Sequence, residues 1–420
     1  MIKNYLRNRY IVLILSLIIL FFGTKNTFYF ENNPSFFLEN TETKEEKEVT
    51  PDELYLSAYK TIKDNYWNKE LVKEALPKWK KRYAGKLETD EDAKVAINSM
   101  LQSLDDPYSK FLDKKDCSEL NNSINSKIYG IGINIDSNAG NTVIVNVIKG
   151  TPAYNAGIKA GDVILKINDE DTGGKNIFEV ASLIKNSKTD VIKMEVSRDN
   201  KKIAKIVKKA EIKIKAVKSD IFNKEIGYIQ ISSFIGNDTP VEFIEAMDKV
   251  KNTKGLILDL RGNTGGLFQN ALFVADIFLK DKNVVTILGR GENKNVYKSK
   301  NEGYVYENPM IVLVDCDSAS ASEIVSGALK DNKRALIVGT KTFGKGLVQK
   351  LFPLKNGSAI NLTIARYLTP NNIDINKKGI TPDYYVEITN DDIKQNKDRQ
   401  LDFAIKTLSL QIERDKISKH

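Results

Sequence analysis

Residues 310–330 read MIVLVDCDSASASEIVSGALK, in which an apolar run is followed within a few residues by a helical pattern. The run 310–314 contains no polar residue, which is typical of a strand buried on both faces. Similar strand-like runs alternate with helical patterns along the C-terminal half of the chain. We expect further strands at 226–231, 255–260, 284–288 and 335–338, and helices at 240–251, 268–279 and 319–330. This alternation predicts an α/β core with buried strands.

Ser320 lies at the junction of this expected strand and the helix that follows it. The first backbone N–H groups of a helix have no intrahelical acceptor, and the helix dipole favours negative charge there. A serine in this place can act as a nucleophile, with the N–H of Ala321 available to hold an oxyanion. The alternative is that Ser318 or Ser320 only caps the helix, with Glu323 completing a capping box with Ser320.

The chain has a single histidine, His420, which is its last residue. A serine nucleophile therefore has no plausible imidazole base, and a lysine is the best candidate to accept its proton. Lys345 stands between two glycines in TFGKGLVQ, residues 342–349. A solvated lysine is protonated at neutral pH, so Lys345 must be desolvated to act as a base. Gln349 can orient it, whereas the alternative for Lys345 is a surface turn.

A second glycine-rich segment, DLRGNTGG at residues 259–266, follows another expected buried strand. Its glycines let the backbone approach a ligand closely. The N–H of Gly265 or of Gly266 can therefore be a second oxyanion donor. The alternative is a tight turn between a strand and a helix.

Residues 339–346, GTKTFGKG, nearly match the phosphate-binding loop G-x-x-x-x-G-K-[ST]. Gly346 stands where that motif needs the hydroxyl that holds Mg²⁺, and the following segment is strand-like rather than helical. Nucleotide binding is therefore not expected.

The net charge of +9 comes from 64 basic and 55 acidic residues spread along the chain. No basic block is interleaved with aromatic residues, so nucleic-acid binding is not expected.

The two cysteines, Cys117 and Cys316, match no metal or redox spacing, and we expect neither a metal nor a cofactor. Cys316 lies in an apolar strand pattern, which predicts a buried free thiol.

Three basic residues among the first nine precede an apolar run over 10–22. This order predicts a cleaved signal peptide or an uncleaved membrane anchor over residues 1–23. Residues 24–50 are polar and charged, as in a linker. Basic residues before the apolar run also predict that the rest of the chain lies outside the cytoplasm.

Helical patterns follow the linker, and a β-rich segment comes after them. Apolar residues at i, i+4 spacing predict a helix from Pro51, and similar patterns cover 69–83 and 91–104. Strands are expected at 128–135, 142–148 and 190–197, a helix at 176–186, and a last helix within 391–412.

Taken together, these segments resemble the C-terminal processing peptidases, or tail-specific proteases, which are serine endopeptidases with a Ser–Lys dyad and an inserted PDZ domain. The resemblance extends over about residues 52–385. The segments that carry it, in order, are DDPYS (105–109), YGIG (129–132), GDVI (161–164), SASASE (318–323), GKGLVQ (344–349) and KGITPD (378–383).

The resemblance implies a role for each candidate residue in the protease core. Ser320 falls on the nucleophile, Lys345 on the general base and Gln349 on the residue that positions it. Ala321 and Gly265 fall on the backbone oxyanion donors, with Gly266 possible for the second. One departure is DCD at residues 315–317. These carboxylates are expected to raise the pKa of Lys345 by stabilising its charged form.

In the PDZ domain, the resemblance places the binding of substrate tails on Tyr129, Gly130, Ile131 and Gly132. Capture of a terminal carboxylate by backbone groups, together with strand addition, gives this role a physical basis.

The resemblance also implies a multidomain α+β protein with a crotonase-like protease core. The expected parts are a helical region (51–112), a PDZ domain with its flanking linker (113–212), the protease core (213–390) and a C-terminal helix (391–420). Such a protein cleaves extracytoplasmic proteins near or from their unstructured C-termini, with the PDZ domain gating its activity. We also expect a homodimer formed through the terminal regions. The alternative function is a non-catalytic scaffold that holds partner tails.

Overall fold

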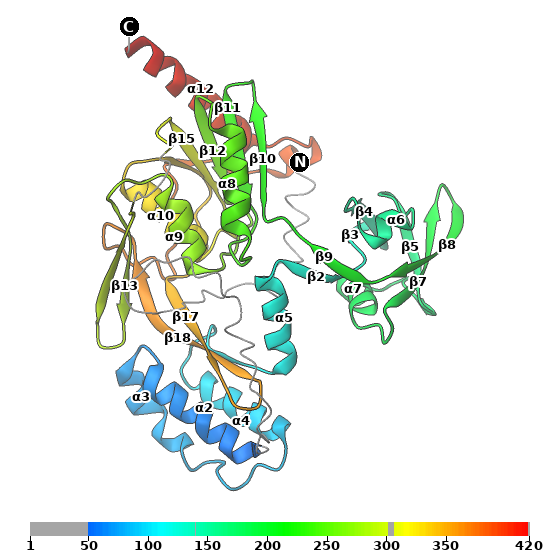
Figure 1. Ribbon diagram of the computed structural model, residues 1–420, viewed down its shortest axis with the longest axis vertical. Coiled ribbons are helices and arrows are strands. Elements are labelled where there is room, and N and C mark those ends of the chain that lie inside the picture. Colours follow the sequence, from blue (N-terminus) through cyan, green and yellow to red (C-terminus); the bar gives the residue numbers. More distant parts are fainter. Residues whose placement is uncertain (1–48, 139, 301–305, 419–420) are drawn as a thin grey trace. The chain divides into compact units, whose positions relative to one another are not determined.

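The computed structural model describes residues 49–138, 140–300 and 306–418 (Figure 1). The expected signal peptide or anchor and almost all of the expected linker lie outside these residues. Within the described part of the chain, no helix is long and apolar enough to cross a membrane. The chain divides into two compact units, one of residues 122–215 and one of the remainder.

A six-stranded sheet forms the centre of the larger unit, and its strands run in the order β10–β11–β12–β15–β16–β19. All neighbours pair in parallel except β10, which is antiparallel to β11 at one edge. Every residue of β12 and β15 is buried, as the apolar runs predicted. The strands are β10 (Val217–Phe222), β11 (Ile226–Ile231), β12 (Gly255–Asp259), β15 (Met310–Val314), β16 (Leu336–Gly339) and β19 (Tyr384–Tyr385).

Helices cover both faces of this sheet because successive side chains of a strand point to opposite sides. Leu256 and Leu258 join one apolar cluster with helices α8, α9 and α10, whereas Ile257 joins another with α12. The helices are α8 (Thr239–Val250), α9 (Phe268–Asp276), α10 (Ala321–Asp331), α11 (Asn390–Lys394) and α12 (Arg399–Ser418).

The prediction that Cys316 is buried is wrong, because β15 ends at Val314 and Cys316 is exposed in the turn after it.

A five-stranded antiparallel sheet carries the N-terminal helices. Strand β18 pairs with β1, β13 and β17, and β14 pairs with β13. Side chains of β18 share an apolar cluster with helices α2 and α4. The elements are α2 (Pro51–Asn65), α3 (Lys69–Ala75), α4 (Asp90–Gln102), β1 (Lys110–Leu112), α5 (Lys114–Ile124), β13 (Asn283–Gly289), β14 (Lys294–Lys298), β17 (Leu347–Pro353) and β18 (Ala359–Leu368).

The smaller unit contains a two-stranded ribbon of β2 and β9 and a six-stranded sheet around one apolar core. The strand expected at 128–135 is interrupted, because Gly132 takes a φ of 86° and a Cβ there would lie 2.3 Å from Thr151. The elements are β2 (Lys127–Gly130), β3 (Ile133–Asn138), β4 (Asn141–Val147), α6 (Pro152–Asn155), β5 (Val163–Ile167), β6 (Glu170–Asp171), α7 (Ile177–Lys185), β7 (Val191–Arg198), β8 (Lys201–Lys208) and β9 (Ala210–Lys213).

A buried ion-pair network joins α12 to the end of β12. The guanidinium of Arg261 lies 2.7 Å from Asp259 and 2.8 Å from Asp398, and its side chain is almost fully buried. Tyr228 donates its hydroxyl hydrogen bond to Asp259 at 2.7 Å. Asp259 and Asp398 hold the pKa of Arg261 well above its ordinary value against the effect of burial.

Replacing Arg261 with methionine should lower the free energy of unfolding by about 3–5 kcal/mol, because it leaves two carboxylates without their buried partner. Urea denaturation measures the loss. Lys73→Met is the control, since Lys73 pairs with Glu70 on the surface and an exposed pair contributes about 0–1 kcal/mol. Equal losses in the two variants would contradict a stabilising role for the network.

Candidate active site

Ser320 stands at the turn between β15 and α10, in a backbone conformation that non-glycine residues seldom adopt. Its φ is 61° and its ψ is −115°, which is costly unless the surroundings impose it. The side chain is fully buried, and its hydroxyl has no hydrogen-bond partner among the described residues. Ser320 is the N-cap of α10, and the Glu323 carboxylate accepts from its N–H as in a capping box. The hydroxyl itself has no partner, so capping does not engage the group that a nucleophile needs.

The two serines on either side have structural partners instead. The Ser318 hydroxyl donates to the carbonyl of Leu260 at 2.8 Å, and the Ser322 hydroxyl donates to that of Asn263, also at 2.8 Å. Both bonds tie the serine cluster to the glycine-rich loop after β12. Of the three serines, only Ser320 therefore has a hydroxyl that is available for chemistry.

The expected oxyanion donors lie beside Ser320. The N–H of Ala321 has no acceptor in the described part of the chain, as expected for the first residue of a helix. Gly265 is so close that a Cβ on it would lie 2.7 Å from the Cβ of Ser320. Its N–H, however, donates to Oδ1 of Asn263 at 2.9 Å. Gly265 must leave this partner before it can serve an oxyanion, whereas the N–H of Gly266 has no acceptor among the described residues.

Lys345 is fully buried, so the surface-turn alternative is wrong. Burial lowers the pKa of its ammonium well below the ordinary value, and Lys110 adds to this effect, whereas Asp106 and Glu323 oppose it. Its Nζ lies 4.8 Å from the centroid of the Tyr108 ring. The neutral form that a general base requires is thus favoured by the site.

The carboxylates that act on Lys345 are not the expected ones. Asp315 accepts hydrogen bonds from the N–H groups of Gly262, Asp317 and Ser318, at 2.9–3.1 Å. It is therefore engaged in shaping the turn after β15. The opposition to a neutral Lys345 comes from Asp106 and Glu323 instead.

Gln349 lies on β17 and is fully buried. Its Nε2 donates to the hydroxyl of Thr363 at 3.2 Å, which fixes the orientation of the amide. Its Oε1 is buried without a partner among the described residues. An oriented carbonyl oxygen of this kind can accept a hydrogen bond from an ammonium group.

The Glu323 carboxylate connects the segments of Ser320 and Lys345. One oxygen accepts from the N–H of Ser320 at 2.8 Å and from that of Lys345 at 2.9 Å. The other accepts from the hydroxyl of Thr342 at 2.6 Å and from the N–H of Gly344 at 2.8 Å. Burial raises the pKa of Glu323, and these four donors act against that rise.

The expected tail-binding residues of the smaller unit are arranged around the start of β3. Tyr129 and Gly130 end β2, and the Tyr129 ring is about half exposed. The carbonyls of Ile131 and Gly132 accept from the N–H groups of Ala153 and Ile148, at 2.8 and 3.0 Å. β3 is an edge strand of its sheet and contacts α7.

Sequence comparisons identify both parts of the chain. Peptidase family S41 matches residues 225–386, and a PDZ domain matches residues 143–198. The carboxy-terminal processing protease CtpA of Bacillus subtilis is 36% identical over 337 residues, which are 79% of this chain and 68% of that protein. The chain belongs to peptidase family S41. A carboxy-terminal-processing protease of Bartonella bacilliformis is 37% identical over 301 residues, covering 70% of this chain and 69% of that protein.

Solved structures agree with this assignment to S41. The photosystem II D1 C-terminal processing protease is 28% identical, with a TM-score of 0.55 over 81% of this chain and 94% of that one. A putative S41 protease from Bacteroides fragilis shares the fold, at 17% identity and a TM-score of 0.58 over 84% of this chain and 97% of that one. The protein is a serine protease of the C-terminal processing family with a PDZ domain. The crotonase-like character of its core stays a prediction.

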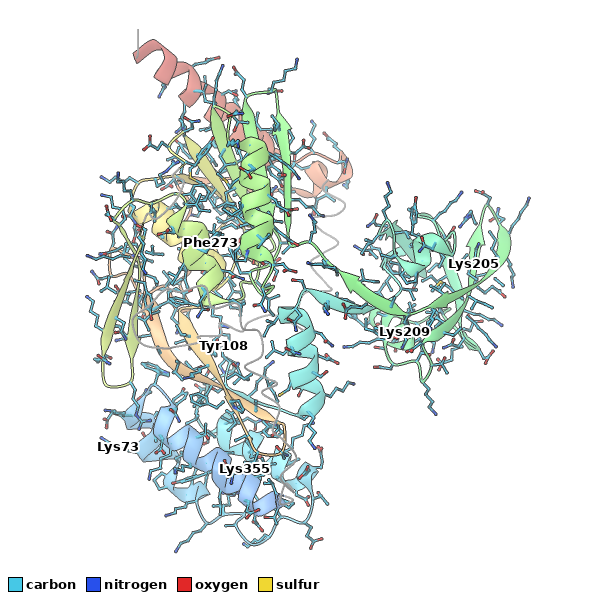
Figure 2. All side chains as sticks on the ribbon, viewed as in Figure 1. Lys73, Tyr108, Lys205, Lys209, Phe273 and Lys355 are labelled. Atoms are coloured by element: carbon cyan, nitrogen blue, oxygen red, sulfur yellow. The ribbon has the colours of Figure 1, made fainter. Side chains whose placement is uncertain are left out.

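The structure of this S41 protease also brings in residues whose place at the site was not predicted. Tyr108 lies beside β18 (Figure 2), where Asn361 donates to its carbonyl at 3.1 Å. The carboxylate of Asp106 accepts from the hydroxyl of Ser109 at 2.6 Å. The segment DDPYS contributes to the family resemblance, but nothing in its own residues indicates contact with a lysine more than 200 positions away.

Proposed function

We propose that the protein is an endopeptidase in which Ser320 is the nucleophile and Lys345 is its general base. The observation that carries this proposal is that Glu323 joins the segment of an available serine hydroxyl to the segment of a buried lysine. The Ser320 hydroxyl is buried without a partner, and the one fully buried lysine of the described chain is tied to the same Glu323 oxygen as Ser320. Burial lowers the pKa of Lys345 well below its ordinary value, which favours the form that can accept a proton.

The reaction follows from these positions. The Ser320 oxygen attacks the carbonyl carbon of the scissile bond while its proton passes to the nitrogen of Lys345. The negative oxygen of the tetrahedral intermediate is held by the N–H of Ala321 and by that of Gly265 or Gly266. Lys345 then protonates the leaving amine, and water hydrolyses the acyl-enzyme by the reverse sequence of proton transfers. Gln349 can orient the protonated lysine by accepting a hydrogen bond at Oε1, which has no partner among the described residues.

The site needs to open before it can act. The side chains of Ser320, Lys345 and Gln349 are all fully buried, so a substrate carbonyl does not reach the nucleophile in this conformation. We infer that binding of a substrate tail to the PDZ domain favours an open form in which the Gly265 N–H leaves Asn263. Gating by a conformational step of this kind is common in enzymes that exclude water from their site.

The relatives' names, carboxy-terminal processing proteases, support a preference for substrate C-termini. The basic and apolar N-terminal segment supports action outside the cytoplasm, with the chain secreted or held at the membrane. We retain the homodimer as a proposal, which light scattering tests directly.

The test is to incubate wild type and Ser320→Ala with an unstructured protein and with candidate extracytoplasmic proteins. New C-termini, identified by mass spectrometry, should appear with wild type and be absent with Ser320→Ala. Cleavage by both would refute the proposed nucleophile. The non-catalytic scaffold predicts that wild type binds C-terminal peptides but neither cleaves them nor reacts with a serine-directed probe.

A further inference from the structure

The nucleophile and the base belong to different sheets of the larger unit. Ser320 follows β15 of the six-stranded parallel sheet, and Lys345 leads into β17 of the five-stranded antiparallel sheet. No single helix or strand therefore holds them at a constant separation. Proton transfer between them needs hydrogen-bond distance, so contacts that cross between the sheets must supply this precision.

Glu323 makes one such contact, from α10 toward Gly344 and Lys345. A second contact runs in the opposite direction, from β18. The Tyr367 hydroxyl lies 3.2 Å from the carbonyl oxygen of Ser320 and also within hydrogen-bond distance of the carbonyl oxygen of Lys345. Glu323 thus joins the two residues through their N–H groups, and Tyr367 joins them through their carbonyls, which share its single hydroxyl proton.

Tyr367 is well placed to act as a rigid support. β18 lies between β13 and β17, and the Tyr367 N–H donates to the carbonyl of Gly346 at 2.9 Å. The ring is almost fully buried within the main apolar cluster. Burial raises the pKa of its hydroxyl well above the ordinary value, and Glu323 adds to this effect, so the hydroxyl keeps its proton and remains a donor.

We propose that Tyr367 is a positioning residue, whose hydroxyl ties the backbones of Ser320 and Lys345 together and so limits the distance that their side chains must close before proton transfer. The proposal rests on the assignment of these two residues as nucleophile and base. Tyr367 reaches neither substrate nor the reacting atoms; it acts through the two carbonyls. The competing explanation is that Tyr367 only fills the core.

The two explanations differ in what a phenylalanine does at this position. Tyr367→Phe keeps the ring and its packing and removes only the hydroxyl. A residue that only fills the core would then lose some stability and no catalytic rate. A positioning residue would lose turnover, because displacement of reacting groups by about 1 Å can cost on the order of 10²-fold in rate.

Tyr55→Phe is the matched control. Tyr55 is equally buried, and its hydroxyl donates to the carbonyl of Trp79 at 2.6 Å within the N-terminal helices. Both variants therefore lose one buried hydrogen bond from a phenol to a backbone carbonyl. Their melting temperatures should fall by similar amounts, which separates loss of stability from loss of positioning.

The experiment measures kcat and KM for a cleavable peptide with wild type, Tyr367→Phe, Tyr55→Phe and Ser320→Ala. We expect kcat to fall roughly 10–100-fold in Tyr367→Phe, with KM little changed, and the labelling of Ser320 by a serine-directed probe to slow in parallel. A kcat in Tyr367→Phe equal to that in Tyr55→Phe would overturn the proposal. Retained cleavage by Ser320→Ala would instead overturn the proposed function, so the two failures are distinguishable.

Discussion

Replacing Lys345 with methionine should abolish cleavage while leaving the protein folded. Methionine has a similar length and suits a fully buried site, but it cannot accept the proton of Ser320. Loss of a member of a catalytic dyad or triad costs on the order of 10⁴-fold or more in kcat. A buried lysine with a lowered pKa opposes folding wherever the unfolded chain is protonated, so the methionine variant should be no less stable than wild type. Turnover and thermal melting, measured on the same preparation, check both expectations.

The pH dependence of wild type follows from the same lysine. Its pKa lies well below the ordinary value because of burial, and only the neutral amine accepts a proton. As the pH falls through this lowered pKa, kcat/KM should therefore fall.

Asp106→Asn removes a charge that raises the pKa of Lys345, so the acid limb of the kcat/KM profile should move to lower pH. Lys110→Met removes a charge that lowers the pKa, so the limb should move to higher pH.

Lys110→Met is also the control for Lys345→Met, because it removes a lysine that is not the proposed base. Lys110 is exposed and affects Lys345 only through its charge, so Lys110→Met should retain most of the wild-type turnover at high pH. Cleavage by Lys345→Met at a rate close to that of Lys110→Met would show that Lys345 is not the base.

Local patterns in the sequence were enough to predict an α/β core with buried strands and the candidate dyad. The apolar run 310–314 predicted a buried strand, and the absence of an internal histidine directed attention to Lys345. The same patterns left open whether Ser320 is a nucleophile or whether Ser318 or Ser320 only caps the helix. What distinguishes Ser320 is that the other two hydroxyls bond to the loop after β12, a contact between segments more than 50 residues apart.

The residues that surround and position the candidate dyad could not be predicted either, because they also contact it from segments that are distant in the sequence. Tyr367 reaches Ser320 only when the two sheets pack, and it lies in no motif. Asp106 lies in DDPYS, a segment that contributes to the family resemblance but does not by itself indicate a site. Glu323 was noted as half of a helix cap, which describes its bond to Ser320. Its bonds to Thr342, Gly344 and Lys345 depend on the path of the chain after β16. Side-chain hydrogen bonds over such distances leave no periodicity in the sequence.

Replacing Glu323 should lower kcat in a graded manner, because its two oxygens serve different partners. Alanine leaves the N–H groups of Ser320, Gly344 and Lys345 without their acceptor, and we expect a fall on the order of 10²-fold or more as the dyad loses its alignment. Glutamine can keep its oxygen toward Ser320 and Lys345 and turn its amide nitrogen toward the Thr342 hydroxyl. Only the Gly344 N–H then lacks an acceptor, so kcat should lie between those of alanine and wild type.

Glu242 offers a matched control for the loss of a buried carboxylate. Its side chain is buried, and one of its oxygens accepts from the N–H groups of Ala216 and Val217, at 2.7 and 3.1 Å, at the start of β10. Glu242→Gln can keep its oxygen on these two N–H groups, but its amide nitrogen then replaces an oxygen that is buried without a partner. An unsatisfied buried donor costs about 1–3 kcal/mol, so the variant should lose stability and keep the wild-type kcat in the folded protein. Glu323→Gln and Glu323→Ala could both lose stability as Glu242→Gln does and keep the wild-type kcat. In that case the Glu323 carboxylate stabilises the fold and does not position the nucleophile and base. A graded loss of kcat with KM retained would instead show that the separation of nucleophile and base is maintained by Glu323, through backbone groups rather than through the reacting side chains.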